Sequence, residues 1–177
     1  MKQLFFLIIM VLGLSSGVVS AQCCRNNSGC GYGRYEQEGC RRYRPQYFIS
    51  DDKVFFDGRE IKGVSASSFE ILSDSYAKDP WAVYYLGEKI KGASPTSFQV
   101  LGYGYARDTW NVYYDGVKID GASSGSFKVL SDWYATDNWN VYYDGKKIPG
   151  ASPDSFKVLT EGYAKDNWNT YHFGRKI

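Results

Sequence analysis

The stretch Tyr105–Ile119, which reads YARDTWNVYYDGVKI, decides the fold, and most of it returns at Tyr134–Ile148 as YATDNWNVYYDGKKI. Val112–Tyr114 is rich in residues that favour β-strands, and Asp115-Gly116 is a hairpin signal before a further strand at Val117–Ile119. The stretch therefore predicts a small antiparallel unit that the chain repeats.

Whole columns of residues recur at a spacing of 29 with no insertion. A period kept without slippage indicates that every module contacts its neighbours in the same way, because one extra residue would break the stacking. The first copy lacks the Tyr-Ala-x-Asp and Trp elements, so residues 49–177 hold one partial and four 29-residue copies. The recurring positions are Asp79, Asp108, Asp137 and Asp166; Trp81, Trp110, Trp139 and Trp168; Gly58, Gly87, Gly116, Gly145 and Gly174; Ile61, Ile90, Ile119, Ile148 and Ile177; and Phe69, Phe98, Phe127 and Phe156.

The rest of each module reads as short extended pieces joined by turns. Tyr105–Arg107 and Phe127–Leu130 predict two further strands, Thr109–Asn111 predicts a turn, and Ser152-Pro153 predicts a single helical turn. We expect an all-β array of short antiparallel strands, about four per module, built as a hairpin meander or solenoid. A closed five-bladed propeller is the alternative, although propeller blades usually take about 40 or more residues.

Two copies place Leu86 and Phe173 where three copies have Asp before the turn glycine. A type I′ turn needs positive φ at both central residues, which Leu and Phe resist. We therefore expect a type I turn closed by a left-handed glycine bulge, which tolerates any residue at that position. The choice shifts the register by one residue and decides which tyrosine faces inward.

The amino-terminal residues predict a signal peptide. Lys2 gives a positive start, Leu4–Leu14 is an apolar run, and Val19–Ala21 places small residues before a cleavage site that leaves Gln22 first. A membrane anchor is disfavoured, because 11 apolar residues fall short of the roughly 20 that span a bilayer. A lipoprotein is the other alternative, although Gln22 precedes Cys23 where lipid attachment favours a small residue. We expect a secreted, periplasmic or cell-surface protein with no membrane span after cleavage.

All four cysteines of the chain follow the signal peptide within 18 residues. In an exported protein an even, clustered set predicts two disulfides. Adjacent cysteines seldom bond to each other, so Cys23 and Cys24 are expected to reach Cys30 and Cys40, in an order that the sequence leaves open. A zinc site is the alternative, but paired C-x-x-C knuckles and a nearby His are missing. The chain thus divides into a signal peptide (1–21), a Cys/Arg-rich segment (22–48) and the β repeat domain (49–177).

Composition excludes one class of partner. Removal of Lys2 with the signal peptide takes the 21 basic residues to 20, against 19 acidic ones. A balance this even argues against nucleic-acid binding, which needs a basic patch or stripe. The aromatic content of 18%, with 16 Tyr and 5 Trp, favours strands, on which a Tyr ring packs while its hydroxyl stays wet.

The runs Asp108–Tyr114 and Asp137–Tyr143, each followed by Asp-Gly-x-Lys-Ile, resemble the DKNYY repeat family of bacterial exported proteins. The preceding Tyr-Ala-x-Asp and the Gly-Ala-Ser-x-x-Ser-Phe loop are also similar to its pattern, and the resemblance covers roughly residues 49–177. This chain departs from the pattern by placing Trp where the family often has a polar residue. The resemblance implies a bacterial envelope or secreted protein, and it supplies no catalytic residues.

The other chemistry-bearing positions favour structural roles. The Asp column lacks the Asp-x-Asp-x-Asp-Gly spacing of a calcium loop, so each Asp is expected to accept backbone N–H groups two residues on. His172, the only histidine, replaces the Tyr or Phe of the other copies, which favours packing over catalysis. We expect no catalytic, cofactor-binding or metal-binding residue. The Lys column is expected to guard strand edges against aggregation, at Lys89, Lys118, Lys147 and Lys176.

The Trp and Tyr columns are the functional candidates. Aromatic rows on a rigid sheet can stack on sugar rings, and they also let short strands bury roughly 150–250 Å² per ring. We expect the Trp rings to fold onto the neighbouring module as one internal seam. The alternative is a ligand-stacking platform made by Trp81, Trp110, Trp139 and Trp168.

The expected function is a non-catalytic binding or scaffold module for glycan or for an envelope protein. The alternative is a carbohydrate-active or cell-wall hydrolase that uses paired carboxylates. It is disfavoured because the Asp and Glu residues are mostly repeated or scattered. The last strand ends at Ile177, and a bare strand edge of this kind can also self-associate.

Overall fold

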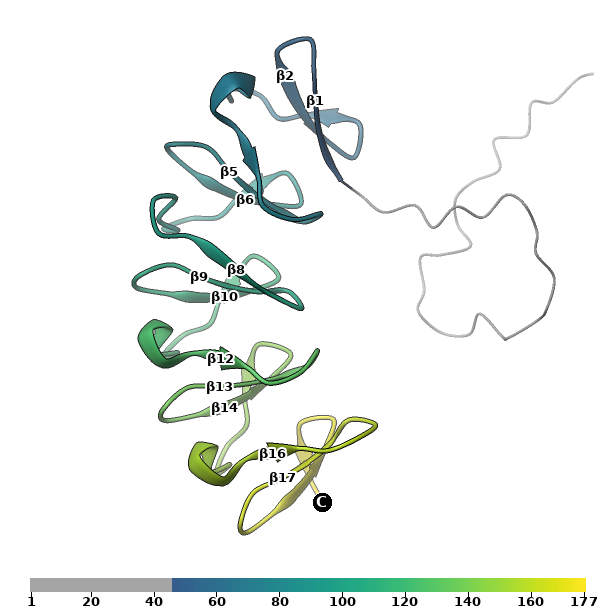
Figure 1. Ribbon diagram of the computed structural model, residues 1–177, viewed down its shortest axis with the longest axis vertical. Coiled ribbons are helices and arrows are strands. Elements are labelled where there is room, and N and C mark those ends of the chain that lie inside the picture. The colour runs from purple at the N-terminus through teal and green to yellow at the C-terminus, as the bar shows by residue number, and fades with distance from the viewer. Residues whose placement is uncertain (1–45) are drawn as a thin grey trace, which may run out of the picture. The chain divides into compact units, whose positions relative to one another are not determined.

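The computed structural model describes residues 46–177, in which 19 short strands form five antiparallel sheets that follow one another in chain order (Figure 1). The all-β array predicted from the repeat is confirmed. Three single turns of 3-10 helix lie along one edge of the array, at Ala66–Ser68 (η2), Ser124–Ser126 (η3) and Pro153–Ser155 (η4). The last of these is the helical turn predicted at Ser152-Pro153, with Pro153 at its start.

The first sheet has three strands and each of the others has four. In order along the chain the strands are β1 Tyr47–Ser50, β2 Lys53–Phe56, β3 Arg59–Glu60, β4 Glu70–Ile71, β5 Tyr76–Lys78, β6 Val83–Tyr85, β7 Glu88–Lys89, β8 Gln99–Gly102, β9 Tyr105–Arg107, β10 Val112–Tyr114, β11 Val117–Lys118, β12 Lys128–Val129, β13 Tyr134–Thr136, β14 Val141–Tyr143, β15 Lys146–Lys147, β16 Lys157–Val158, β17 Tyr163–Lys165, β18 Thr170–His172 and β19 Arg175–Lys176. We call each sheet, with the loop that leads out of it, a module.

Both faces of an inner sheet are buried. Neighbouring residues of a strand point to opposite faces, so Tyr105 and Val112 pack towards the following module, whereas Ala106 and Tyr113 pack towards the preceding one. All four side chains are fully buried. A sheet of such short strands cannot bury both faces by itself, so each module depends on its neighbours.

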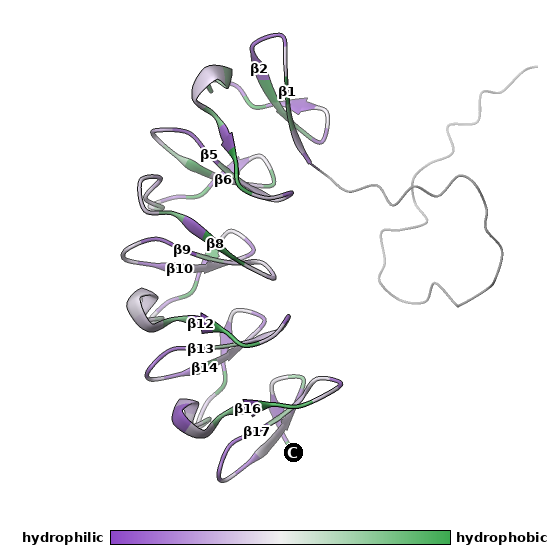
Figure 2. Cartoon of the chain, viewed as in Figure 1, coloured by the Kyte–Doolittle hydropathy of each residue, from purple (hydrophilic) through white to green (hydrophobic). Residues whose placement is uncertain are grey.

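The hydrophobic core is therefore divided into four clusters, each shared by two consecutive modules. Figure 2 shows the hydrophobic segments on the strands and connections, whereas the turns at the edges are mostly hydrophilic or neutral. A ring triplet repeats in each cluster, as in Tyr105–Phe127–Tyr142, whose successive ring centroids lie 5.5 and 5.4 Å apart. The constant spacing of 29 residues between repeated positions thus reflects four copies of one interface.

A tyrosine hydroxyl bridges each pair of modules. The Tyr105 hydroxyl donates to the Trp133 carbonyl at 3.2 Å and accepts the Gly145 N–H at 3.1 Å. Tyr47, Tyr76 and Tyr134 make the same two bonds to the modules that follow them. Burial raises the pKa of Tyr105 to about 12, although the Gly145 N–H opposes this, so the hydroxyl keeps its proton and remains a donor. We call this arrangement the tyrosine clamp.

The hairpin turns differ from the bulge that the sequence predicted. Tyr114 pairs with Val117 across a two-residue loop, and both loop residues have positive φ, 48° at Asp115 and 75° at Gly116. This is a type I′ turn, and Leu86 and Phe173 adopt it as well, at φ 49° and 46°. The expectation of a glycine bulge was wrong because it weighed only the local preference of Leu and Phe. The inter-module bonds fix the turn.

The turn glycine is required by a close approach between modules. A Cβ atom on Gly145 would lie 2.5 Å from the Cβ of Tyr114 in the preceding module, and one on Gly116 would lie 2.6 Å from the ring of Tyr85. Any larger residue would separate the modules. The N–H of the same glycine belongs to the tyrosine clamp, so packing and hydrogen bonding both act on this turn.

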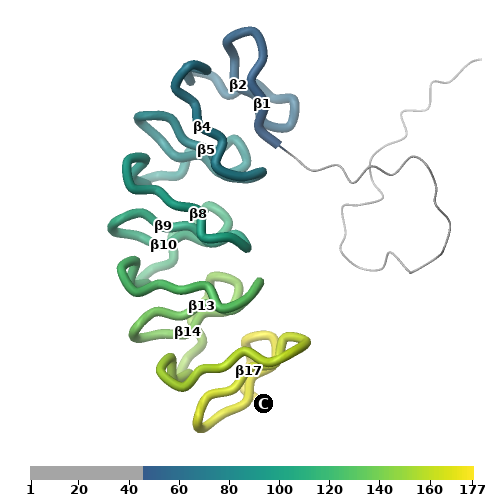
Figure 3. The backbone as a smooth tube through the Cα atoms, viewed as in Figure 1, coloured from purple at the N-terminus to yellow at the C-terminus, as the bar shows by residue number. Residues whose placement is uncertain are grey.

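The array is open, unlike the propeller held as the alternative. Each core cluster of residues 46–177 joins consecutive sheets, and none joins β1–β3 to β16–β19. Figure 3 shows the chain leaving each sheet and entering the next. Ile148 packs towards the following module and is 5% exposed. Ile177 occupies the same column in the last sheet, where no module of the described array covers that face, and it is 69% exposed.

Tyr105→Phe keeps the ring and removes the clamp hydroxyl. The Gly145 N–H and the Trp133 carbonyl then lose this partner, so we expect the free energy of unfolding to fall by about 1–3 kcal/mol. Tyr163→Phe is the matched control, since Tyr163 occupies the same column but forms no clamp within residues 46–177. We expect that change to cost no more than about 0.5 kcal/mol. Urea denaturation followed by circular dichroism measures both, and equal losses would contradict the clamp.

Candidate functional site

The four column tryptophans lie on the surface. Trp81, Trp110, Trp139 and Trp168 are 86%, 79%, 77% and 83% exposed, and none has a ring contact with another described aromatic residue. The expected internal seam was therefore wrong. The tyrosines and phenylalanines already fill the interfaces, and the Trp position falls on a turn that points away from them. We call the four residues the tryptophan row.

A buried aspartate holds each tryptophan turn. Asp108 Oδ1 accepts the N–H groups of Trp110 and Asn111, both at 2.7 Å. Its Oδ2 accepts the Tyr113 hydroxyl at 2.9 Å and the Ser94 N–H at 3.0 Å. The same bonds recur at Asp137 and Asp166, and three of the four recur at Asp79. The capping role predicted for the Asp column is confirmed.

These bonds keep the carboxylates ionised. Burial raises the pKa of Asp166, but three backbone N–H groups and the Tyr171 hydroxyl outweigh it and lower the pKa from 3.8 to about 2. Burial is likewise outweighed at Asp79, Asp108 and Asp137, whose pKa values are also lowered. The aspartates are saturated with donors inside the protein, so they serve the turn and offer little to a ligand.

Further contacts fix the turn to its surroundings. The Thr109 N–H donates to Ser97 Oγ at 3.2 Å, and Asn138 and Asn167 make the equivalent bond at the same distance. The Ser124 hydroxyl, in the loop that leads out of the same sheet, donates to the Asp108 carbonyl. The indole rings are thus exposed while the backbone beneath them is held. Hydrogen bonds from three sides fix the conformation of the turn on which Trp110 stands.

The remaining sequence candidates lie elsewhere. Lys89, Lys118, Lys147 and Lys176 are exposed on the edge strands β7, β11, β15 and β19, as expected for edge protection. His172 is half-buried and stacks on Tyr163 with ring centroids 4.1 Å apart. Cys23, Cys24, Cys30 and Cys40 lie outside the described residues. Residues 46–177 contain no cluster of three metal-ligating side chains and no helix long and apolar enough to cross a membrane.

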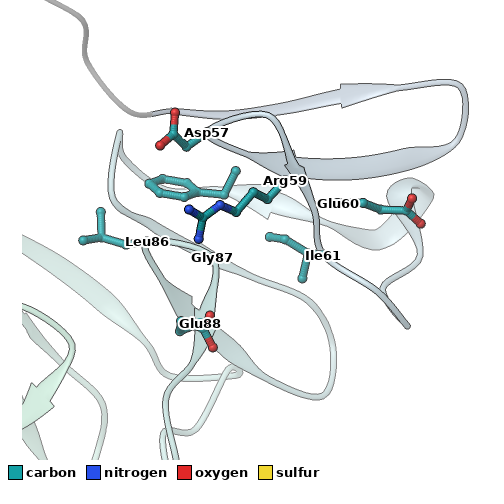
Figure 4. Close-up of a pocket in the computed structure, with 8 residues that line it drawn as sticks. Asp57, Arg59, Glu60, Ile61, Leu86, Gly87 and Glu88 are labelled. Carbon is teal, nitrogen blue, oxygen red and sulfur yellow. The ribbon is translucent and has the colours of Figure 1, made fainter. Parts of the chain in front are cut away.

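Grooves lie between neighbouring hairpin turns, at the other end of the strands from the tryptophan turns. Figure 4 shows the groove between the β2–β3 and β6–β7 turns, where the carboxylates of Asp57, Glu60 and Glu88 point in different directions. Glycoside hydrolysis uses two carboxylates that face one substrate bond, and this groove holds no such pair. In the equivalent groove two modules further on, Asp144 accepts the Tyr114 hydroxyl at 3.1 Å.

Sequence reasoning missed a set of charged positions at the base of the tryptophan turns. In each of the last four modules the residue just before the capping Asp pairs across the sheet with a residue of the preceding strand. The four pairs are Glu70–Lys78, Gln99–Arg107, Lys128–Thr136 and Lys157–Lys165. Because the residue types change from copy to copy, the positions do not stand out as a column. Only the strand register brings them together.

A family model described as DKNYY family matches residues 47–175, which is nearly the whole described array. No curated protein and no solved structure matches the chain. The family match spans all five modules, including the first, where Tyr47 occupies the position of the clamp tyrosine.

Acid should destabilise the array through the capping aspartates. Their folded pKa values lie below the usual 3.8, so their stabilisation is complete above pH about 5 and is lost as the pH falls towards 2. We expect the urea midpoint to fall steadily between pH 5 and 2.5. In Asp137→Ala the midpoint should be lower at pH 7 and should depend less on pH. A midpoint that stays constant over this range would contradict the capping role.

Trp139→Ala should leave the stability of the protein almost unchanged. The ring is 77% exposed, so its removal creates no cavity, and we expect a change within about 0.5 kcal/mol. Truncation of a buried large aromatic residue would cost about 3–5 kcal/mol. Tyr142→Ala, in the adjacent strand of the same module, provides that comparison because Tyr142 is 1% exposed. A loss at Trp139 as large as that at Tyr142 would show that the ring is packed.

Proposed function

We propose that this chain, which belongs to the DKNYY family, is a non-catalytic repeat module that binds polysaccharide through its tryptophan row. The observation that carries the proposal is the repeated exposure of the four indoles, each at least 77% exposed on the same capped turn. The same large aromatic side chain thus returns on the surface in four successive modules, and such a row offers a series of ring faces on which a ligand can stack.

The contrast with the other aromatic columns supports a binding role. Tyr76, Tyr105, Tyr113, Tyr134, Tyr142 and Tyr171 are all at most 1% exposed, so the fold buries its aromatic residues wherever it needs them. The indoles contribute little to the core, because at least 77% of each residue is exposed and none makes a ring contact with another described aromatic residue. Their presence at four copies of one turn is then best explained by a ligand.

A polymeric ligand fits the spacing of the row. Sheets that pack face to face lie roughly 10 Å apart, so one indole recurs along the edge at about the spacing of successive modules. A polysaccharide presents a repeating apolar sugar face and can contact several indoles at once. Four weak contacts on one chain add up through a high effective concentration. The capped turns reduce the ordering cost of each contact.

The polar neighbours of the row also fit a sugar ligand. One indole of the row occurs in each of the last four modules, and three of the four have polar neighbours in the sequence, such as Asn138 beside Trp139, whereas Trp81 lies between Pro80 and Ala82. Such a surface combines ring stacking with hydrogen bonds to hydroxyl groups. A protein partner would favour a larger continuous apolar centre.

The setting that we propose is extracellular. The proposed signal peptide would export the chain, and two disulfides within Cys23, Cys24, Cys30 and Cys40 would then form in the Cys/Arg-rich segment. We propose no enzymatic activity, since the repeated aspartates are engaged in turn capping and the carboxylates of the groove in Figure 4 point in different directions.

The test is retention of the protein on polysaccharide. The mature chain is mixed with chitin, with cellulose and with purified peptidoglycan, and is titrated with soluble hydroxyethyl cellulose and carboxymethyl cellulose. We expect binding to at least one of these, and Trp110→Ala with Trp139→Ala to weaken it about five-fold per ring, or about 1 kcal/mol each. Reducing sugar released from the same samples reports the alternative hydrolase activity, and we expect none.

Tyr103→Asn is the control for the tryptophan variants. Tyr103 is 60% exposed but lies in the β8–β9 turn, away from the tryptophan row, and Asn tolerates its positive φ. We expect this change to leave retention intact. Retention that is absent on every polysaccharide, or that survives removal of all four indoles, would overturn the proposed function.

A further inference from the structure

The base of the tryptophan row carries an uneven charge. In the second module Lys78 forms an ion pair with Glu70 at 3.3 Å, so this cross-strand pair is neutral. In the third module Arg107 pairs with Gln99, donating to Gln99 Oε1 at 3.4 Å from Nε and 3.3 Å from Nη2. The acid of the second module is thus replaced by a neutral amide, which leaves one positive charge.

The charge increases in the last two modules. Lys128 pairs with Thr136, which again gives one positive charge, and Lys157 pairs directly with Lys165, which gives two. None of these three lysines forms an ion pair within residues 46–177. The cross-strand pairs therefore become more basic from the second module to the last.

This arrangement is not a by-product of a basic protein. The described array has slightly more acidic than basic side chains. Like charges placed directly opposite each other in a sheet are destabilising, so Lys157 and Lys165 carry a cost that the second module avoids with Glu70. A cost of this kind next to a row of exposed indoles suggests that an external anion neutralises the charge.

Shallow grooves lie beside the cross-strand pairs of the second and third modules. Equivalent residues line the two grooves, Ser68, Glu70 and Lys78 in one, and Ser97, Gln99 and Arg107 in the other. The capping aspartate that precedes each indole by two residues lines the same groove, as Asp79 and as Asp108. A sugar stacked on an indole can thus place a substituent in the adjacent groove, within reach of the cross-strand pair.

We propose that the ligand of the tryptophan row is an anionic polysaccharide, and that Lys157 and Lys165 bind its acidic groups beside Trp168. This inference rests on the proposed function and names the class of ligand. Carboxylate, sulfate and phosphate groups share the chemistry that two exposed ammonium groups recognise. In the second module the cross-strand pair is neutral, so Trp81 would bind the sugar by stacking alone. The last module therefore provides most of the selectivity for charged sugars.

An anionic membrane is the other partner that tryptophan and lysine together can fit. The polysaccharide is favoured because the indoles recur singly, one in each of four successive modules. Membrane insertion needs several apolar side chains that enter the bilayer together. Binding to vesicles is nevertheless included in the test as an outcome that would overturn the proposal.

The experiment compares carboxymethyl cellulose with hydroxyethyl cellulose, which share one backbone and differ in charge. With the full mature chain at low salt, we expect tighter binding to carboxymethyl cellulose, and we expect added NaCl to weaken that binding only. The Lys157→Gln/Lys165→Gln double variant should bind carboxymethyl cellulose on the order of ten-fold more weakly. Its binding to hydroxyethyl cellulose should not change. Dextran sulfate in a competition assay distinguishes sulfate from carboxylate recognition.

Lys118→Gln/Lys146→Gln is the matched control. It removes the same charge from the hairpin-side groove of the inner modules, and we expect both affinities to stay unchanged. Equal losses in the two double variants would show that only net charge matters and would overturn the proposal. Equal affinity for the two celluloses would also overturn it, while tryptophan-dependent binding to both would leave the proposed function standing. Tryptophan-dependent binding to phosphatidylserine vesicles, without binding to either cellulose, would replace the polysaccharide with a membrane.

The thermal midpoint of the Lys157→Gln/Lys165→Gln variant separates binding from folding. Removal of two facing lysines relieves repulsion, so we expect the midpoint to stay the same or to rise. A loss of carboxymethyl cellulose binding with an unchanged or higher midpoint supports direct contact. A lowered midpoint together with weaker binding to both celluloses would show that the lysines act through the fold, and would overturn the assignment.

Discussion

The tyrosine hydroxyl that crosses from one module to the next is the interaction on which the rest of the structure depends. It accepts the N–H of the turn glycine and donates to the carbonyl at the preceding turn, as Tyr105 does to Gly145 and Trp133. Each sheet has too few and too short strands to be stable alone. The clamp sets the turn conformation, the turn sets how closely two modules approach, and that approach closes the ring triplet between them.

This constraint separates the roles of two aromatic residues. Tyrosine has a hydroxyl that can bridge modules, so it fills the interfaces together with phenylalanine. Tryptophan lies on a turn whose backbone N–H groups are bonded to a buried aspartate, and its ring lies outside the core. The fold thus provides a stiff support with a row of indoles at its edge. That row, with the basic pairs beneath it, is the surface that we assign to an anionic polysaccharide.

The period of 29 predicted much of the fold, and less of the site. Val112–Tyr114 and Asp115-Gly116 predicted a strand and a hairpin because their local preferences agree with the tertiary structure. The turn type at Leu86 was missed because inter-module bonds override its preference for negative φ. Burial of Trp139 was wrongly expected, because a repeated column shows that a position matters and not which way its side chain points. The Lys157–Lys165 pair needed the strand register.

The partition of tyrosine inside and tryptophan outside can be measured with tryptophan fluorescence. Four of the five tryptophans form the row and Trp133 is the fifth, so Trp133→Phe leaves a protein whose emission reports the row alone. We expect emission at the wavelength of water-exposed indole, with all four rings quenched by acrylamide nearly as well as free tryptophan. A blue-shifted emission that resists acrylamide in the folded protein would mean that the indoles form an internal seam, and would contradict the surface position of the tryptophan row.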